Sequence, residues 1–213
     1  MADELVFRVW FIALYVLFVI PRVYYRFVRP RRDDVDAEVA EREAFGVVQA
    51  AMTIVILGFL VSSVLYLIGL PWMDWFQIAQ YSVWLRSVGA VIALIMPLLL
   101  AWIHRELDRQ YSAILEIKKD HRLITTGPYE KVRHPMYTVL TLFSLGISMV
   151  TGNALIILFA VLLMIGFPFW VRIEEEKMIE TFGDEYIEYM KRTGRFLPRL
   201  SKPQERPSIT ETE

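Results

Sequence analysis

The sequence predicts an all-α, polytopic integral membrane protein with about five transmembrane helices, the last two forming a C-terminal helical hairpin. The 213-residue chain is 55% hydrophobic, and its apolar residues gather in long runs. Its Lys and Arg residues gather between those runs rather than within them. A helix needs about 20 apolar residues to cross the hydrocarbon core of a bilayer, so the runs indicate membrane spans.

The first three spans are expected at residues 5–20, 44–70 and 84–103. The first follows Asp3 and Glu4 rather than a basic segment, so it is expected to be a retained helix and not a cleaved signal peptide. The second is the clearest, because residues 44–70 contain no charge. Together, residues 1–103 are predicted to form an N-terminal membrane region of three helices.

The hairpin is expected within residues 136–171, a long apolar run interrupted by Thr151-Gly152-Asn153. A turn there divides the run into helices near 136–150 and 154–171. The first arm has about 15 residues, so it either tilts or stops short of a full crossing.

The remaining segments are charged or amphipathic. Residues 31–43 are predicted to form an interfacial helix, and residues 174–191 an amphipathic helix whose apolar positions recur every three or four residues. The cytoplasmic segment after residue 103, the hairpin and the amphipathic helix together make residues 104–200 the expected functional core. Residues 201–213 are polar and are predicted to be a disordered tail.

The distribution of basic residues predicts the orientation. Of 23 Lys and Arg residues, only Arg8 and Arg86 fall on the side of the N-terminus. Because basic residues favour cytoplasmic loops, the N-terminus is predicted to lie outside, with the candidate site and the C-terminus in the cytoplasm.

Composition excludes several functional classes. The chain has no cysteine, which excludes disulfides, thiolate metal sites and cysteine nucleophiles. Its three histidines are scattered, so the sequence indicates no metal site. The formal net charge of −1 gives no reason to expect a nucleic-acid partner. The expected partners include membrane lipids, and the oligomeric state stays open.

One polar cluster precedes the hairpin, from Gly127 to Tyr137. Gly127-Pro128 marks a turn, and Pro135 suits the first position of a helix with His134 at its cap. The backbone N–H groups of that helix start favour carboxylates and phosphates. The alternative is that Arg133 and His134 are ordinary interfacial residues.

A second cluster follows the hairpin, where Arg172 precedes Glu174, Glu175 and Glu176. Carboxylates at a membrane boundary are costly to desolvate, but they suit a sulfonium or ammonium ligand. The alternative is an acidic first turn of the amphipathic helix, stabilised by the helix dipole.

Residues 123–198 resemble the isoprenylcysteine carboxyl methyltransferase family, which is also similar to phosphatidylethanolamine N-methyltransferases. The matching residues appear in the order Gly127-Pro128-Tyr129, Val132-Arg133-His134-Pro135-Met136-Tyr137, Glu174-Glu175, Phe182-Gly183-Asp184-Glu185-Tyr186, Tyr189, Arg195 and Pro198. A lone Arg-His-Pro is a weak signal, whereas the ordered set across an uncharged hairpin is specific.

The resemblance implies an S-adenosylmethionine-dependent methyltransferase whose lipophilic acceptor enters from the bilayer. It implies cofactor contacts at Gly127, Tyr129, His134, Tyr137, Glu175, Tyr186 and Arg192. It makes Glu174, Arg172 and Arg195 the candidates for catalysis or for positioning the acceptor. Arginine suits a carboxylate acceptor such as a prenylcysteine, and Glu174 suits an amine.

One position departs from the family, and two other functions remain open. Val139 stands where the family often carries a small residue, so the pocket is expected to be narrower or the acceptor to approach differently. Sterol reductases share similar Gly-Pro-Tyr and Arg-His-Pro segments but use NADPH and usually have about twice as many spans. A non-enzymatic membrane scaffold is the second alternative.

Overall fold

The computed structural model describes residues 2–24, 42–78, 80–107 and 123–199. These residues form the helices α1 (Ala2–Val23), α2 (Arg42–Ile68), η2 (Pro71–Phe76), α3 (Val83–Leu107), η4 (Gly127–Glu130), α4 (Pro135–Thr151), α5 (Ala154–Phe182) and α6 (Asp184–Arg192). Within these ranges there is no named strand, only two isolated β-bridges. The all-α prediction is therefore confirmed.

Four of these helices, α1, α2, α3 and α5, are long and apolar enough to cross a membrane. Helix α4 has 17 residues, which gives it a length of about 26 Å. That is slightly less than the roughly 30 Å hydrocarbon core, as predicted for the first arm of the hairpin. Large hydrophobic side chains such as Val47 and Ile54 are exposed on the outer faces, where lipid tails would solvate them.

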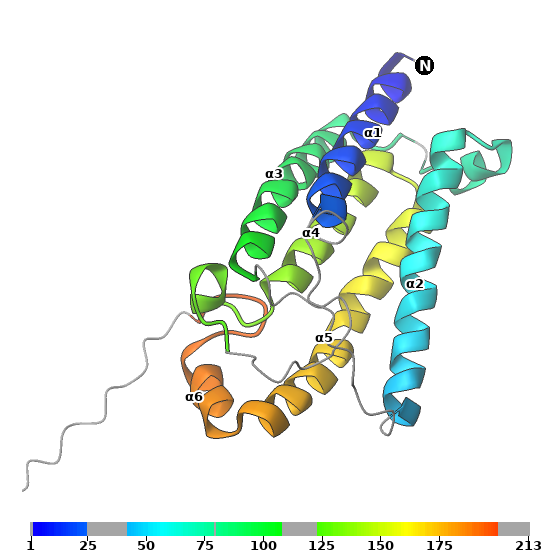
Figure 1. Cartoon of the computed structure of the whole chain (residues 1–213). Helices are drawn as coiled ribbons and strands as arrows, with labels where there is room; N and C mark the ends of the chain where they lie inside the picture. Colours follow the sequence, from blue (N-terminus) through cyan, green and yellow to red (C-terminus); the bar gives the residue numbers. More distant parts are fainter. Residues whose placement is uncertain (1, 25–41, 79, 108–122, 200–213) are drawn as a thin grey trace, which may run out of the picture.

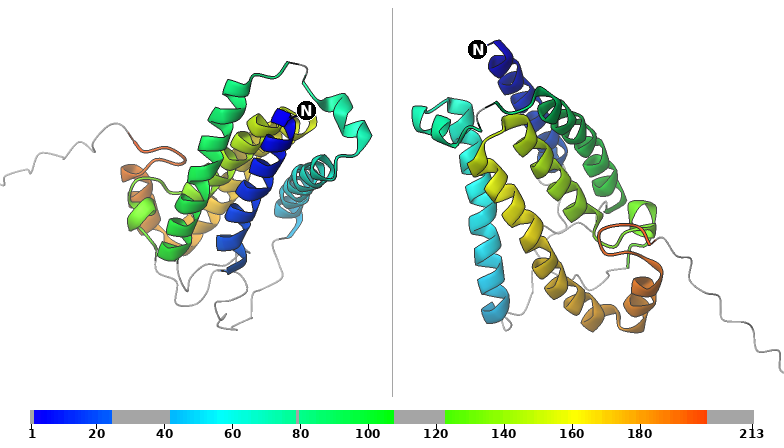
Figure 2. Two further views of the ribbon diagram at one scale, coloured as in Figure 1. Left: turned by 90° about the horizontal axis from the view of Figure 1, so that it is seen from above. Right: turned by 180° about the vertical axis from the view of Figure 1, so that it is seen from behind.

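Helix α4 occupies the middle of the bundle. It packs against α1, α3 and α5, while α2 packs chiefly against the far side of α5 (Figures 1 and 2). Helices α3 and α4 approach closely because Gly89 faces Gly146. A Cβ atom on Gly89 would lie 2.6 Å from the Gly146 carbonyl oxygen, so no larger residue fits this crossing. Small residues at such crossings let membrane helices pack backbone against backbone.

The hairpin turn forms where predicted. Gly152 ends α4 in the left-handed conformation, with φ of 61°. Asn153 caps α5, because its Oδ1 accepts hydrogen bonds from the backbone N–H groups of Leu155 and Ile156. Its Nδ2 donates to the Met73 carbonyl at 3.1 Å, which ties the hairpin tip to η2.

Replacing Asn153 with alanine is expected to destabilise the protein by about 2 kcal/mol, because it removes a helix cap and leaves the buried Met73 carbonyl without its donor. Thermal unfolding in detergent measures this loss. Ser87→Ala is the matched control, since it removes an exposed side-chain hydrogen bond within α3. Equal transition temperatures for the two variants would contradict the capping role.

The predicted start of the amphipathic helix is wrong. Glu174 lies inside α5, which continues without a break from Ala154 to Phe182. The break comes at Gly183, with φ of 53°, and the shorter α6 follows. The alternative in which the three glutamates form an acidic first helical turn is therefore wrong as well. At 29 residues, α5 is about 44 Å long, so its end extends beyond a hydrocarbon core of about 30 Å.

The structure changes one further boundary that the sequence predicted, and two predicted segments lie outside the described residues. The third span is longer than predicted, because α3 ends at Leu107 rather than near residue 103. The expected interfacial helix at 31–43 lies outside the described residues, except that residues 42 and 43 begin α2. The expected disordered tail at 201–213 also lies outside them.

Candidate active site

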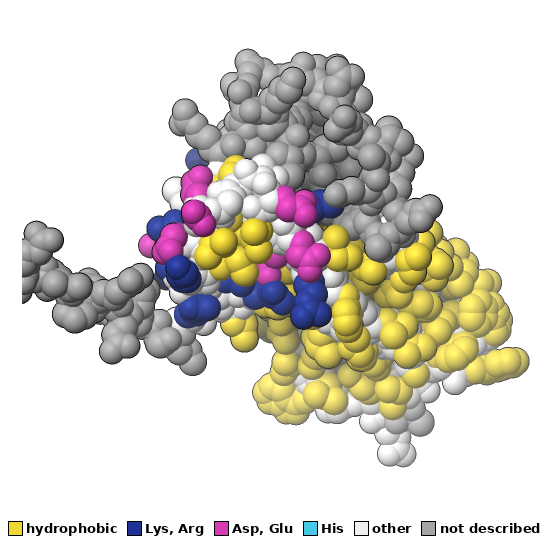
Figure 3. Space-filling model, turned by 90° about the horizontal axis from the view of Figure 1, so that it is seen from below, with side chains coloured by type: hydrophobic (Ala, Val, Ile, Leu, Met, Phe, Trp, Pro, Cys, Tyr) yellow, Lys and Arg dark blue, Asp and Glu magenta, His cyan; other side chains and the backbone are white. Residues whose placement is uncertain are grey.

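The start of α4, the end of α5 and the helix α6 meet at one end of the bundle, opposite the N-terminus (Figure 1). We call this region the charged end. Seen from below in Figure 3, it carries Lys, Arg, Asp and Glu side chains, with hydrophobic side chains on the adjoining flank. The sequence clusters before and after the hairpin both lie here, because α4 starts and α5 ends on the same side.

Backbone hydrogen bonds join the segment before α4 to the segment after α6. The Arg133 N–H donates to the Gly194 carbonyl at 2.8 Å, and the His134 N–H donates to the Arg195 carbonyl at 3.0 Å. The Gly194 N–H returns a bond of 3.1 Å to Lys131. This short parallel pairing brings Arg195 beside the Arg-His pair.

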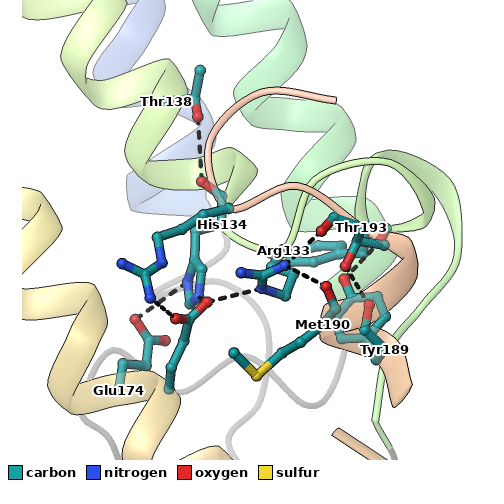
Figure 4. Close-up of polar contacts among 10 residues, drawn as sticks. Arg133, His134, Thr138, Glu174, Tyr189, Met190 and Thr193 are labelled. Carbon is teal, nitrogen blue, oxygen red and sulfur yellow. Dashed lines mark hydrogen bonds and ion pairs between the residues drawn. The ribbon is translucent and has the colours of Figure 1, made fainter. Parts of the chain in front are cut away.

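Glu175 is the centre of the site, with only 2% of its surface exposed. Arg133 Nε donates to Glu175 Oε1 at 2.8 Å, and Arg195 donates to Glu175 Oε2 (Figure 4). His134 Nε2 lies 3.3 Å from Oε1. A buried carboxylate is costly unless cations and donors surround it, and here two guanidinium groups supply both.

Glu174 lies on the same turn of α5 but has different neighbours. Its Oε2 lies 3.6 Å from His134 Nδ1, and its carboxylate is hydrogen-bonded to the Tyr137 side chain. Within the described part of the chain, Glu174 Oε2 and His134 Nε2 are buried without a well-directed hydrogen bond. Buried polar atoms in this state are rare in proteins, and a catalytic or binding role is one of the explanations for them.

Tyrosines from η4 and α6 pack beside this cluster. The Tyr189 hydroxyl donates to the Tyr129 carbonyl at 2.6 Å, which links α6 to η4. Burial raises the pKa of Tyr189 to about 12, so the phenol keeps the proton it donates. Tyr186 is buried with its ring 5.8 Å from that of Tyr189, and the Arg192 guanidinium lies 5.6 Å from the Tyr189 ring. The two ring contacts lie within α6, and the Tyr189 hydrogen bond joins this helix to η4.

The structure separates three other sequence candidates from the Glu175 cluster. Gly127 begins η4 with φ of 59° and lies against the Glu106 side chain. Arg172 is exposed on α5, and none of the contacts described around Glu175 includes it. Val139, the departure from the family pattern, is buried in the hydrophobic core.

Two residues of the site were missed as site residues by sequence reasoning. Arg133 stands in the Arg-His-Pro motif, but a single basic residue at a membrane boundary does not reveal what it binds. Thr193, which is 1% exposed, offers its carbonyl to Arg133 at 2.6 Å. These residues are 60 positions apart, so only the family motif could have drawn attention to Arg133.

Comparisons with known proteins match the region that contains this site. Residues 84–185 match the family model described as phospholipid methyltransferase, which includes Arg133, His134, Glu174 and Glu175 but ends before Arg195. A protein-S-isoprenylcysteine O-methyltransferase from Schizosaccharomyces pombe is 37% identical over 95 residues, which cover 43% of this chain and 40% of the relative.

Two further relatives show similar coverage. A protein-S-isoprenylcysteine O-methyltransferase from Saccharomyces cerevisiae is 36% identical over 91 residues, covering 41% of this chain and 38% of the relative. The cobalt-zinc-cadmium resistance protein CzcN from Cupriavidus metallidurans is 35% identical over 85 residues, covering 39% of each chain. The chain thus spans about two fifths of the length of the relatives it matches. The ordered motifs and these matches together show that residues 84–185 are similar to the phospholipid methyltransferase family and to protein-S-isoprenylcysteine O-methyltransferases.

Proposed function

We propose that the protein transfers a methyl group from S-adenosylmethionine to a lipophilic acceptor that reaches the charged end from the bilayer. The observation that carries this proposal is the buried, unbonded Glu174 Oε2 beside His134, at the end of a helix that leaves the membrane. A carboxylate oxygen without a donor suits a cationic ligand, and S-adenosylmethionine carries both a sulfonium and an ammonium group. The similarity of residues 84–185 to phospholipid methyltransferases supports the same reaction class.

When bound, S-adenosylmethionine supplies an electrophilic methyl group, and its transfer to a nucleophile is an in-line displacement. The protein's contribution is alignment and exclusion of water rather than proton transfer. Glu174 is placed to hold the cationic part of the cofactor, and Tyr137 orients the Glu174 carboxylate. His134 lies between the two glutamates, with Nδ1 near Glu174 and Nε2 near Glu175.

The proposed acceptor is a prenylcysteine-like carboxylate, as the names of the two yeast relatives suggest. Arg195 is better placed than Arg172 to hold such a carboxylate. Its guanidinium contacts Glu175, yet 38% of its side chain is exposed, so part of the group faces outward. Arginine binds carboxylates through paired N–H donors, which fits this role. The remaining sequence candidates Gly127, Tyr129, Tyr186 and Arg192 are proposed to shape the cofactor pocket through η4 and α6.

The proposed orientation places this site in the cytoplasm, where S-adenosylmethionine is available. It is supported by the bias of basic residues in the sequence, because all but Arg8 and Arg86 of the 23 Lys and Arg residues fall in the segments that are expected to be cytoplasmic. The fold agrees with an odd number of crossings, since the N-terminus and α6 lie at opposite ends of the bundle (Figure 1).

The function is tested first by ligand binding to the purified protein in detergent. Isothermal titration with S-adenosylhomocysteine and with NADPH separates a methyltransferase from a reductase, and binding of neither supports a scaffold. Transfer of a labelled methyl group to a prenylated cysteine with a free carboxylate is then expected. The same compound with its carboxylate converted to an amide should receive no label, and labelling of the amide would contradict a carboxylate acceptor.

A further inference from the structure

Arg133 connects three parts of the charged end. Its Nε donates to Glu175 on α5, and one terminal nitrogen donates to the carbonyls of Met190 at 3.2 Å and Thr193 at 2.6 Å (Figure 4). The two carbonyls belong to the last turn of α6 and to the residue after it. The planar guanidinium is suited to this task, because its N–H groups point in fixed directions.

The segment that Arg133 holds also carries Arg195. We call residues 193–196 the C-terminal segment. Besides its pairing with residues 131–134, it is held by Thr138, whose hydroxyl donates to the Phe196 carbonyl at 2.9 Å. Gly194 is required for its path, since a Cβ atom there would lie 1.7 Å from the Leu197 carbonyl oxygen. The backbone is thus held in one conformation on both sides of Arg195.

The two arginines that neutralise Glu175 differ in how much of each side chain a ligand can reach. The Arg133 side chain is 7% exposed, and two of its three nitrogens bind protein groups. The Arg195 side chain is 38% exposed. A small molecule at the site can therefore reach Arg195 far more easily than Arg133.

We propose that Arg133 is a positioning residue, which holds the C-terminal segment so that Arg195 meets Glu175, and that it does not itself contact the acceptor. This inference rests on the proposed function for its effect on catalysis, but its structural part does not. Residues that position a reacting pair affect the rate strongly, because a displacement of about 1 Å can lower it by roughly 100-fold.

The experiment measures the mobility of the C-terminal segment directly. The chain has no cysteine, so Leu197→Cys, at a side chain that is 72% exposed, gives one site for a nitroxide spin label. Mobility is read by electron paramagnetic resonance in Arg133→Ala, Arg133→Lys and Lys131→Ala backgrounds. Lys131→Ala is the matched control, because Lys131 is exposed and uses only its backbone in the pairing. Methyl transfer and S-adenosylhomocysteine binding are measured without the label.

Arg133→Ala is expected to increase label mobility and to lower kcat by on the order of 100-fold. The KM for the acceptor is expected to change far less than kcat. Arg133→Lys is expected to resemble alanine, since a single ammonium cannot reproduce three directed bonds. Lys131→Ala should match the unmodified protein in every measurement.

Two results would overturn the proposal. One is unchanged mobility together with a large rise in acceptor KM, which would make Arg133 a direct acceptor contact. The other is full rescue by lysine, which would make its charge alone sufficient. If Arg133→Ala does not fold, Thr138→Val is measured instead, because this substitution releases the same segment and leaves the contacts of Glu175 in place. Increased label mobility with a lower kcat supports the proposal, and no change in either quantity rejects it. If the unmodified protein neither binds S-adenosylhomocysteine nor transfers methyl groups, the proposed function fails. The mobility measurement still tests whether Arg133 holds the C-terminal segment in place.

Discussion

Replacement of Glu175 by glutamine is expected to lower the stability of the protein by roughly 3–5 kcal/mol and to reduce cofactor binding as a consequence. The carboxylate is 2% exposed and lies between Arg133 and Arg195. Glutamine keeps one acceptor oxygen but removes the charge, so two guanidinium groups are left close together without a counter-ion. Breaking a buried pair on one side is costly because the remaining charge stays desolvated.

Thermal unfolding in detergent, without any ligand, measures this effect. Glu176→Gln is the control, because it removes the same charge one residue later on α5 at an exposed position. The sequence resemblance counts Glu175 among the cofactor contacts and so predicts that Glu175→Gln weakens ligand binding through a lost direct contact. Loss of binding with a transition temperature equal to that of Glu176→Gln would therefore support the sequence interpretation against the structure.

Replacement of Glu174 by glutamine is expected to leave stability almost unchanged but to weaken S-adenosylmethionine binding by about 10–100-fold, the range for losing a hydrogen bond or contact with a charged group. The Glu174 Oε2 atom is buried without a well-directed bond in the described part of the chain, so little native interaction is lost. S-adenosylhomocysteine lacks the sulfonium charge. Its affinity is therefore expected to fall less.

The ratio of the two affinities is the decisive measurement. It is obtained by titrating each ligand into the unmodified protein, Glu174→Gln and the Glu176→Gln control. A larger loss for the sulfonium compound identifies Glu174 as a group that lies near the sulfonium charge. An equal loss for both would show that Glu174 binds a part that the two ligands share, such as the ammonium group. No loss for either would remove Glu174 from the site.

The sequence by itself determined the helical membrane fold and the position of the hairpin turn. Both depend on local properties: the length of an apolar run decides whether it can span a bilayer, and Gly152 and Asn153 end one helix and begin the next. The change from apolar to acidic residues at Glu174 wrongly predicts a helix start there. No residue that breaks helices stands between Trp170 and Gly183, so α5 continues through the glutamates.

The candidate site also depends partly on sequence motifs and partly on tertiary contacts. The ordered motifs indicated the family resemblance, and they made His134, Glu174 and Glu175 candidates because these residues follow the order of the family's motifs. Only the tertiary structure decided that the two adjacent glutamates have different surroundings, with Glu175 held by Arg133 and Arg195 and Glu174 left with an unbonded oxygen. That distinction depends on pairing the C-terminal segment with residues about 60 positions earlier. No local pattern specifies such a contact, because it forms only when the helices between the two segments pack.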